Sequence, residues 1–252
     1  MTESKVELAL ETRNLTVRFG GLVAIDNLDF SVRRGELRCL IGPNGAGKTT
    51  LYNLITSRIR PTSGRIFFNG EDITNLPADV VCKKGIGRKF QVPSVFPELT
   101  VSDNLRVACQ GKSGLLDLMK RGYVDSVEAD VAKTLEAIRL REKAEELAGS
   151  LSHGEKQWLE IGMVLVNKPQ LLLLDEPTAG MTVEETLETA KLIKSVSAGL
   201  TTVIIEHDIN FVREIADIIT VLHRGAKLAE GPLAEIARNE MVRNVYLGKQ
   251  EL

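Results

Sequence analysis

Long apolar runs are missing from this chain of 252 residues. The longest aliphatic runs, such as residues 171–174, have the length of a strand and not of a membrane span. Residues 1–8 mix acidic and basic side chains and do not resemble a signal peptide. If the protein serves a membrane process, we therefore expect it to dock onto the helices of other subunits.

Cysteine and net charge are also scarce. Cys39, Cys82 and Cys109 are odd in number and widely spaced, a pattern that predicts reduced core thiols of a cytosolic protein rather than a disulfide or zinc framework. The formal net charge of −2 gives no reason to expect nucleic acid as the main partner. The remaining composition, 43% hydrophobic and 26% charged, is typical of a globular protein with one large domain or a domain and a lobe.

One glycine-rich stretch organises the rest of the chain. It fits the phosphate-binding pattern G-x-x-x-x-G-K-[ST] and consists of Gly42, Pro43, Asn44, Gly45, Ala46, Gly47, Lys48 and Thr49. A strand-like run precedes it and a helix-like run follows. Its backbone N–H groups would surround an anion at the positive end of a helix, with Lys48 at the β- and γ-phosphates and the Thr49 hydroxyl on Mg²⁺. We assign this loop, together with Thr50, as a nucleotide site; a glycine turn with a surface lysine is the alternative.

Two further segments carry polar groups that suit a triphosphate. Asp175 and Glu176 follow four leucines, at the carboxyl end of a predicted buried strand. Asp175 suits an Mg²⁺ shell and Glu176 an attacking water, whereas a solvated acidic turn is the alternative. Ser152 and Gly154 precede a predicted helix and form a second anion site. The alternative there is an ordinary capping box between Ser152 and Glu155, and both readings are compatible.

Strand and helix patterns alternate on both sides of residues 100–166. The strand-like runs are residues 10–17, 28–32, 37–41, 65–68, 85–90, 170–174, 202–206, 218–222 and 226–230, and the helix-like runs between and after them are residues 48–57, 74–84, 183–198, 209–216 and 233–246. Within residues 101–166 strand patterns are almost absent, and Val127, Val131, Leu135 and Ile138 share one helix face. We therefore predict an α/β fold with a largely parallel, covered sheet and an inserted helical lobe.

Five motifs in this order resemble the nucleotide-binding subunit of ABC transporters. They are the phosphate loop, Gln91, the segment 151–155, the Asp175-Glu176 pair and His207. The resemblance implies a P-loop NTPase core with a mostly parallel sheet and an antiparallel β portion. It implies a single ABC ATPase domain over residues 1–252, with a RecA-like and β core at 1–99 and 167–252 and an inserted α-helical subdomain at 100–166.

The resemblance also implies individual roles. Phe19 is similar to the aromatic residue that stacks on adenine, where the family more often has tyrosine; a core aromatic is the alternative. Gln91 resembles the glutamine that links the Mg²⁺ site to the membrane partner, and His207 resembles the histidine that senses the γ-phosphate. Outside the family order both would be ordinary loop residues. The implied Mg²⁺ ligands are Thr49, Gln91 and Asp175, and the implied catalytic residues are Gln91, Glu176 and His207.

The chain departs from the family pattern in two places. The signature is more usually Leu-Ser-Gly-Gly-Gln, and here His153 and Glu155 occupy two of its positions. Because Ser152 and Gly154 remain, we expect anion binding to be retained, with Glu155 capping the helix backbone. Residues 177–182 lack the aspartate that is common in the family's next loop.

The family works as a head-to-tail pair, with each ATP between the phosphate loop of one subunit and the signature of the other. We therefore expect ATP and Mg²⁺ as cofactors, a second ABC ATPase subunit (identical or a close relative) and transmembrane permease subunits. An extracytoplasmic solute-binding protein would act indirectly. This places the chain at the cytoplasmic face of the membrane. Residues 91–97, with Val92, Val95 and Phe96, would offer the permease an apolar surface, unless they serve local packing.

The subgroup is indicated by shorter stretches. Residues 18–22, 85–91, 205–208 and 246–248 resemble the branched-chain amino acid importers, and residues 151–163 are more similar to the urea importers within that group. A lipid or lipopolysaccharide exporter is the alternative machine. ABC ATPases of ribosomes or DNA usually carry two nucleotide domains or a long coiled-coil insert, which this chain lacks. A regulatory module with little hydrolysis is opposed by the intact polar set of Lys48, Asp175, Glu176 and His207.

Overall fold

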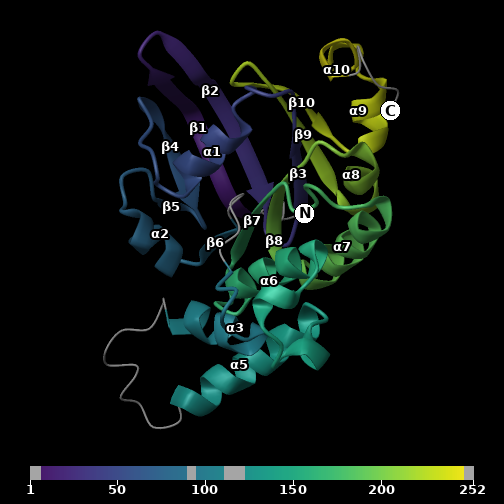
Figure 1. Ribbon diagram of the computed structural model, residues 1–252. Coiled ribbons are helices and arrows are strands. Elements are labelled where there is room, and N and C mark those ends of the chain that lie inside the picture. The colour runs from purple at the N-terminus through teal and green to yellow at the C-terminus, as the bar shows by residue number, and fades with distance from the viewer. Residues whose placement is uncertain (1–6, 90–94, 111–122, 247–252) are drawn as a thin grey trace, which may run out of the picture.

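Two β-sheets and a group of helices make up the protein (Figure 1). The structure is a computed structural model that describes residues 7–89, 95–110 and 123–246. The antiparallel sheet has the order β2-β1-β4-β5 and contains β1 (Leu8–Phe19), β2 (Leu22–Arg33), β4 (Ser63–Phe68) and β5 (Glu71–Asp72). The second sheet has the order β10-β9-β3-β8-β7-β6 and contains β3 (Leu37–Ile41), β6 (Ile86–Lys89), β7 (Leu171–Asp175), β8 (Thr201–Ile205), β9 (Ile218–His223) and β10 (Ala226–Gly231).

The six-stranded sheet is parallel except at its β9–β10 edge. Every residue of β3, β7 and β8 is buried, as expected for strands that are covered on both faces and rich in aliphatic side chains. This arrangement confirms the predicted α/β fold, with a mostly parallel sheet and an antiparallel β portion. Because β3, β8 and β7 are parallel neighbours, their carboxyl ends lie at the same end of the sheet. The motifs that follow these strands are therefore brought together.

Helices cover both faces of the second sheet (Figure 1). The helices of the described residues are α1 (Lys48–Ile55), α2 (Ala78–Lys83), α3 (Val101–Gln110), α5 (Tyr123–Ala137), α6 (His153–Leu165), α7 (Val183–Val196), α8 (Ile209–Ile215), α9 (Leu233–Arg238) and α10 (Glu240–Tyr246), with short 3-10 helices η1 (Arg141–Lys143) and η2 (Ala148–Ser150). Leu51 and Leu54 of α1 belong to a core that includes Leu40, on one face of β3. Leu159 of α6 belongs to a second core with Cys39, on the opposite face. The α1 and α6 helices therefore pack against different faces of the sheet.

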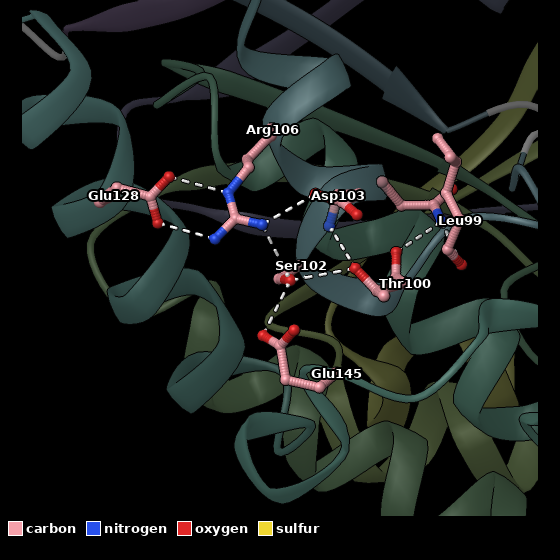
Figure 2. Close-up of polar contacts among 8 residues, drawn as sticks. Leu99, Thr100, Ser102, Asp103, Arg106, Glu128 and Glu145 are labelled. Carbon is pink, nitrogen blue, oxygen red and sulfur yellow. Dashed lines mark hydrogen bonds and ion pairs between the residues drawn. The ribbon is translucent and has the colours of Figure 1, made fainter.

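The helices α3, α5 and α6 form the helical region of the molecule. The predicted apolar face of α5 is confirmed, because Val131 and Leu135 are buried, as is Ile138 just beyond the helix. A polar network at the start of α3 connects the helices on their outer side (Figure 2). In it, Arg106 donates two hydrogen bonds to Glu128 of α5, at 2.8 and 2.9 Å. The same guanidinium reaches Asp103 at 2.8 Å, and both carboxyl groups have lowered pKa values because they accept hydrogen bonds from it.

Two expectations from the sequence are wrong in detail. Residues 233–246 form two helices and not one, because Asn239 has an extended backbone (ψ 112°) between α9 and α10. Its side-chain oxygen accepts hydrogen bonds from the amides of Met241 and Val242, so that it begins a new helix. Among the cysteines, Cys39 is a buried core thiol, but Cys82 is exposed and Cys109 is only partly buried.

Candidate nucleotide-binding site

The glycine-rich loop joins β3 to α1, as the pattern predicted, and close packing requires two of its glycines, Gly42 and Gly47. Gly42 and Gly47 have φ values of 153° and 105°, in a region that L side chains rarely adopt. A Cβ atom on Gly42 would lie 2.3 Å from the carbonyl oxygen of Leu222, and one on Gly47 would lie 2.7 Å from that of Ala24. The loop is therefore pressed against the neighbouring backbone, and a side chain at either position would displace it.

The exposed part of the loop is the part that would surround an anion. Asn44, Gly45 and Thr49 are exposed, and Thr50 is partly buried in the first turn of α1. The carbonyl of Ala46, in contrast, accepts a hydrogen bond of 2.9 Å from the turn between β9 and β10. One side of the loop is thus anchored to the sheet while the other presents backbone amides and the Thr49 hydroxyl.

Lys48 is held inside the loop. Its Nζ donates to the carbonyl oxygens of Gly42 at 2.6 Å and Pro43 at 3.1 Å. Burial lowers the pKa of Lys48, and the nearby carboxylates of Glu176 and Asp175 act in the opposite direction. Within the described residues, the ammonium group is therefore desolvated and donates to two carbonyl oxygens, which it can exchange for a more strongly charged acceptor.

Asp175 ends β7 with its side chain almost fully buried. Its Oδ2 accepts a hydrogen bond of 3.1 Å from Arg88 of β6. Burial raises the pKa of Asp175, and the Arg88 guanidinium opposes that shift. The other guanidinium nitrogen of Arg88 donates to Asn53 of α1 at 2.7 Å, and the group lies over the ring of Tyr52 at 5.3 Å. Arg88 therefore links the carboxylate to the helix that begins at the phosphate loop.

Glu176 and His207 lie side by side after β7 and β8. The Oε1 atom of Glu176 is 4.0 Å from Nδ1 of His207. Glu176 has a φ of 47°, the left-handed conformation, and its amide donates to the carbonyl of Ile205 at 3.0 Å. His207 is largely exposed. A carboxylate and an imidazole that follow adjacent parallel strands thus lie close together at the carboxyl ends of these strands.

Ser152 begins α6, the helix that packs on the sheet face opposite to α1. Its hydroxyl accepts from the amide of Glu155 at 3.2 Å, and the Glu155 carboxylate accepts from the amide of Ser152 at 3.0 Å. This confirms the predicted capping box and the capping role of Glu155. Lys143 neutralises the Glu155 carboxylate at 2.7 Å, and the pKa of Glu155 is lowered by these hydrogen bonds against the effect of burial.

Further predicted site residues fall in different places. Phe19 ends β1 with 49% of its surface exposed, so it is not a core aromatic. Gly154 is buried in the first turn of α6, and Phe96 is exposed before α3 while Val95 is partly buried. Gln91 lies outside the described residues, as does Val92.

Sequence reasoning missed two charged residues at this edge of the sheet, Arg88 and Glu206. Arg88 lies in β6 beside another charged residue, Lys89, and Glu206 directly follows β8, so neither carries a local signal that marks it as part of a site. Glu206 has no exposed surface, and its carboxylate accepts hydrogen bonds from Thr178 and from the amide of His207. Their partners lie 87 and 28 residues away in the chain, at Asp175 and Thr178, so that only the fold reveals these contacts.

The fold and this edge of the sheet define a phosphate-binding-loop ATPase of the α/β class. The family described as "ABC transporter" matches residues 25–179. The chain is 38% identical over 249 residues to the high-affinity branched-chain amino acid transport ATP-binding protein BraF of Pseudomonas aeruginosa, covering 95% of this chain and 98% of BraF. It is also 38% identical to LivG of Escherichia coli K12, with the same coverage.

Solved structures agree with these relatives. The ADP conformation of MJ1267, an ATP-binding cassette of an ABC transporter, superimposes with a TM-score of 0.84 at 33% identity, covering 96% of this chain and 99% of that one. A dimeric post-hydrolysis state of the cassette MJ0796, bound to ADP and Pi, gives a TM-score of 0.75 at 26% identity, covering 89% and 98%. The chain therefore belongs to the ABC transporter ATP-binding family and is an ATP-binding ATPase cassette. Among its described residues, no helix is both long and apolar enough to cross a bilayer.

Proposed function

We propose that the protein is the ATP-hydrolysing subunit of an importer for branched-chain amino acids, working with transmembrane permease subunits. The observation that carries this proposal is the similarity to BraF and LivG over almost the whole length of each chain. Urea is the second candidate solute, because residues 151–163 resemble the urea importers. The relatives reported above carry the names of amino acid transporters, and none of them favours lipid export.

ATP would bind along the phosphate loop. The backbone N–H groups of residues 42–47 other than Pro43, and the ammonium of Lys48, would hold the phosphates once Lys48 leaves the carbonyls of Gly42 and Pro43. The exposed ring of Phe19 would stack on the adenine. Hydroxyl and carboxylate oxygens are the ligands Mg²⁺ prefers, so Thr49 and Asp175, with Gln91, suit this ion. Mg²⁺ would there neutralise charge on the β- and γ-phosphates.

Glu176 would accept the proton of the attacking water, and His207 would contact the γ-phosphate. A general base has to lie within hydrogen-bond reach of the water it activates, and the partly exposed side chain of Glu176 lies beside the exposed side chain of His207. The left-handed backbone of Glu176 turns its side chain away from the buried direction taken by Asp175. Two adjacent carboxylates thereby obtain different surroundings, one buried for the metal and one partly exposed for the water.

A second subunit would complete the site. Ser152 and Gly154 begin α6 on the opposite face of the sheet from α1, so one chain offers two incomplete anion sites in different layers. The dimeric form of MJ0796 supports a paired arrangement, either of two copies or with a close relative. We propose the division into a core at 1–99 and 167–252 and a helical subdomain at 100–166, with Phe96 at the permease contact and the complex at the inner face of the membrane.

A Glu176→Gln variant tests this function. We expect ATP hydrolysis to fall by at least about a hundredfold, because the base is lost while the phosphate site is intact. Size-exclusion chromatography with ATP should show a dimer that the unaltered protein forms only transiently. Glu214 is an exposed carboxylate on α8, and Glu214→Gln is the matched control, which should keep full turnover. Unchanged hydrolysis in Glu176→Gln would remove Glu176 from the catalytic role.

The solute is tested separately. Co-purification with permease subunits, followed by reconstitution into vesicles, would allow uptake of labelled leucine to be compared with uptake of labelled urea. We expect ATP-dependent uptake of leucine. Uptake of urea alone would overturn the amino acid assignment and leave the ATPase assignment intact.

A further inference from the structure

The carboxylate of Glu206 joins the two segments that carry the proposed catalytic groups. We propose that Glu206 is a positioning residue for ATP hydrolysis, which fixes the turn after Glu176 to the backbone of His207. This inference rests on the proposed roles of Glu176 and His207. Glu206 itself has no exposed surface and so would not touch the nucleotide.

The turn at Glu176 needs a restraint of this kind. A non-glycine residue with a φ of 47° is in the left-handed region, which is unfavourable and persists where the surroundings determine it. The amide of Glu176 is held by the carbonyl of Ile205 at 3.0 Å, and its own carbonyl accepts from the amide of Ala179 at 3.2 Å. Further along the turn, Thr178 is held by hydrogen bonds to the carboxylate of Glu206.

The contacts of Glu206 reach both segments. Its Oε1 accepts from the amide of Thr178 at 3.2 Å and from the Thr178 hydroxyl at 2.5 Å. Its Oε2 accepts from the amide of His207 at 2.9 Å and lies 3.6 Å from Nδ1 of the same residue. Each oxygen of one carboxylate is therefore engaged by a different segment, one after β7 and one after β8. Movement of one segment relative to the other would break a hydrogen bond to this buried carboxylate, which is unfavourable.

Only a carboxylate satisfies this arrangement. It has two acceptor oxygens, whereas the isosteric carboxamide has one oxygen and one NH₂ group that only donates. In Glu206→Gln, the NH₂ group would face an amide N–H at either Thr178 or His207, and that contact would be lost. The side chain would keep its volume, so that packing around it stays nearly the same. Glu206→Gln thus removes a hydrogen bond between the two segments without creating a cavity in the core. Its effect on kcat reports on the hydrogen bond and not on packing.

The experiment measures steady-state ATP hydrolysis and amide hydrogen exchange in the full chain. For Glu206→Gln we expect kcat to fall by about tenfold while KM for ATP stays within about twofold, since the phosphate loop is untouched. The amide that the NH₂ group faces, either that of Thr178 or that of His207, should exchange faster. Thr178→Val, which removes the hydroxyl but keeps the amide, should lower kcat by about threefold. Asp217→Asn is the control, because this exposed carboxylate accepts a hydrogen bond from the amide of Leu37, at the opposite end of the strands from Glu206.

A double variant distinguishes a positioning role from a general structural one. If Glu206 acts through His207, Glu206→Gln should lower kcat by less than about twofold when His207→Ala is already present. A full tenfold loss on that background, an equal rise in KM, or an unchanged kcat in Glu206→Gln would overturn the inference. If Glu206→Gln does not fold, an unchanged kcat in Thr178→Val overturns it. Absence of hydrolysis in the unaltered protein would instead contradict the proposed function, and the exchange rates would still test the connection.

Discussion

Ion pairs are buried in one region of the molecule and exposed to solvent in another. At the β6 edge of the six-stranded sheet, Arg88–Asp175 and Lys89–Glu160 are buried, with side chains no more than 5% exposed. In the helical region, the network around Arg106 is open to solvent, with 34% of its side chain exposed (Figure 2). Both regions use charged groups to connect elements that are distant in the chain, but the dielectric surroundings differ.

This difference predicts what each set of charges contributes. A buried pair repays the loss of hydration only while both partners are present, so that removing one partner is strongly unfavourable. An exposed pair is already hydrated and screened, and its loss is felt weakly. The two buried pairs lie on adjacent residues of β6, one directed to the nucleotide edge and one to α6. They therefore connect the site to the helical region at a place that tolerates little change.

Removal of one buried partner gives the largest expected effect on stability. In the unaltered protein, Nζ of Lys89 lies 3.1 Å from Oε2 of Glu160. In Lys89→Met the carboxylate of Glu160 stays in the core without this cation. We expect a loss of about 3 kcal/mol in the free energy of unfolding. Urea denaturation followed by circular dichroism measures it.

The matched control replaces both charges. In Lys89→Met with Glu160→Met, apolar groups of similar volume fill the space, and we expect most of the lost stability to return. A double variant as unstable as Lys89→Met alone would show that the pair contributes beyond mutual neutralisation, contrary to this view.

A conservative change at Arg88 should have a smaller effect. Arg88→Lys keeps a cation beside Asp175 but loses the planar group that also reaches Asn53 and lies over Tyr52. We expect a loss of about 1–2 kcal/mol in unfolding free energy, since hydrogen bonds to charged groups contribute this much. Thermal unfolding measures it, and Arg65→Lys, at an exposed pair of 3.5 Å, is the control. If Arg88→Lys and Arg65→Lys lowered the unfolding free energy equally, the expected difference between buried and exposed ion pairs would be contradicted.

The features that the sequence predicted well are local. The phosphate loop, the buried strands and the capping box of Ser152 and Glu155 involve neighbours within a few residues, so pattern and spacing are enough to find them. The break at Asn239 was missed although it is local, because the apolar pattern of residues 233–246 continues across it.

The features that the sequence did not reveal depend on tertiary contacts. Arg88 and Glu206 are recognised only through partners in other strands, Asp175 and Thr178. Nothing in their neighbourhood distinguishes them from charged residues at strand ends that face solvent, such as Arg33 of β2. The motifs thus predicted a candidate site whose chemistry stays a prediction, while the residues that hold its segments in place could be found only from the fold.

The smallest expected effect belongs to the network at the start of α3. Arg106→Met removes the hydrogen bonds to Glu128 and Asp103, all on partly exposed side chains. Because solvent screens these charges, we expect a loss of no more than about 1 kcal/mol in unfolding free energy and no change in ATP hydrolysis. A loss of unfolding free energy as large as that of Lys89→Met would contradict the view that exposed ion pairs contribute less stability than buried ones.

The pH dependence of this network sharpens the comparison further. Hydrogen bonds from Arg106 hold the pKa values of Asp103 and Glu128 below their ordinary values of 3.8 and 4.5. The two carboxylates therefore contribute their stability fully above those ordinary values, and the contribution disappears as the pH falls through the lowered ones. Unfolding free energies of the unaltered protein and Arg106→Met, measured from pH 7 to about pH 3, should differ most at neutral pH and converge in acid. A gap that stays constant with pH would show that Arg106 stabilises the helical region through the packing of its aliphatic part and not through its charge.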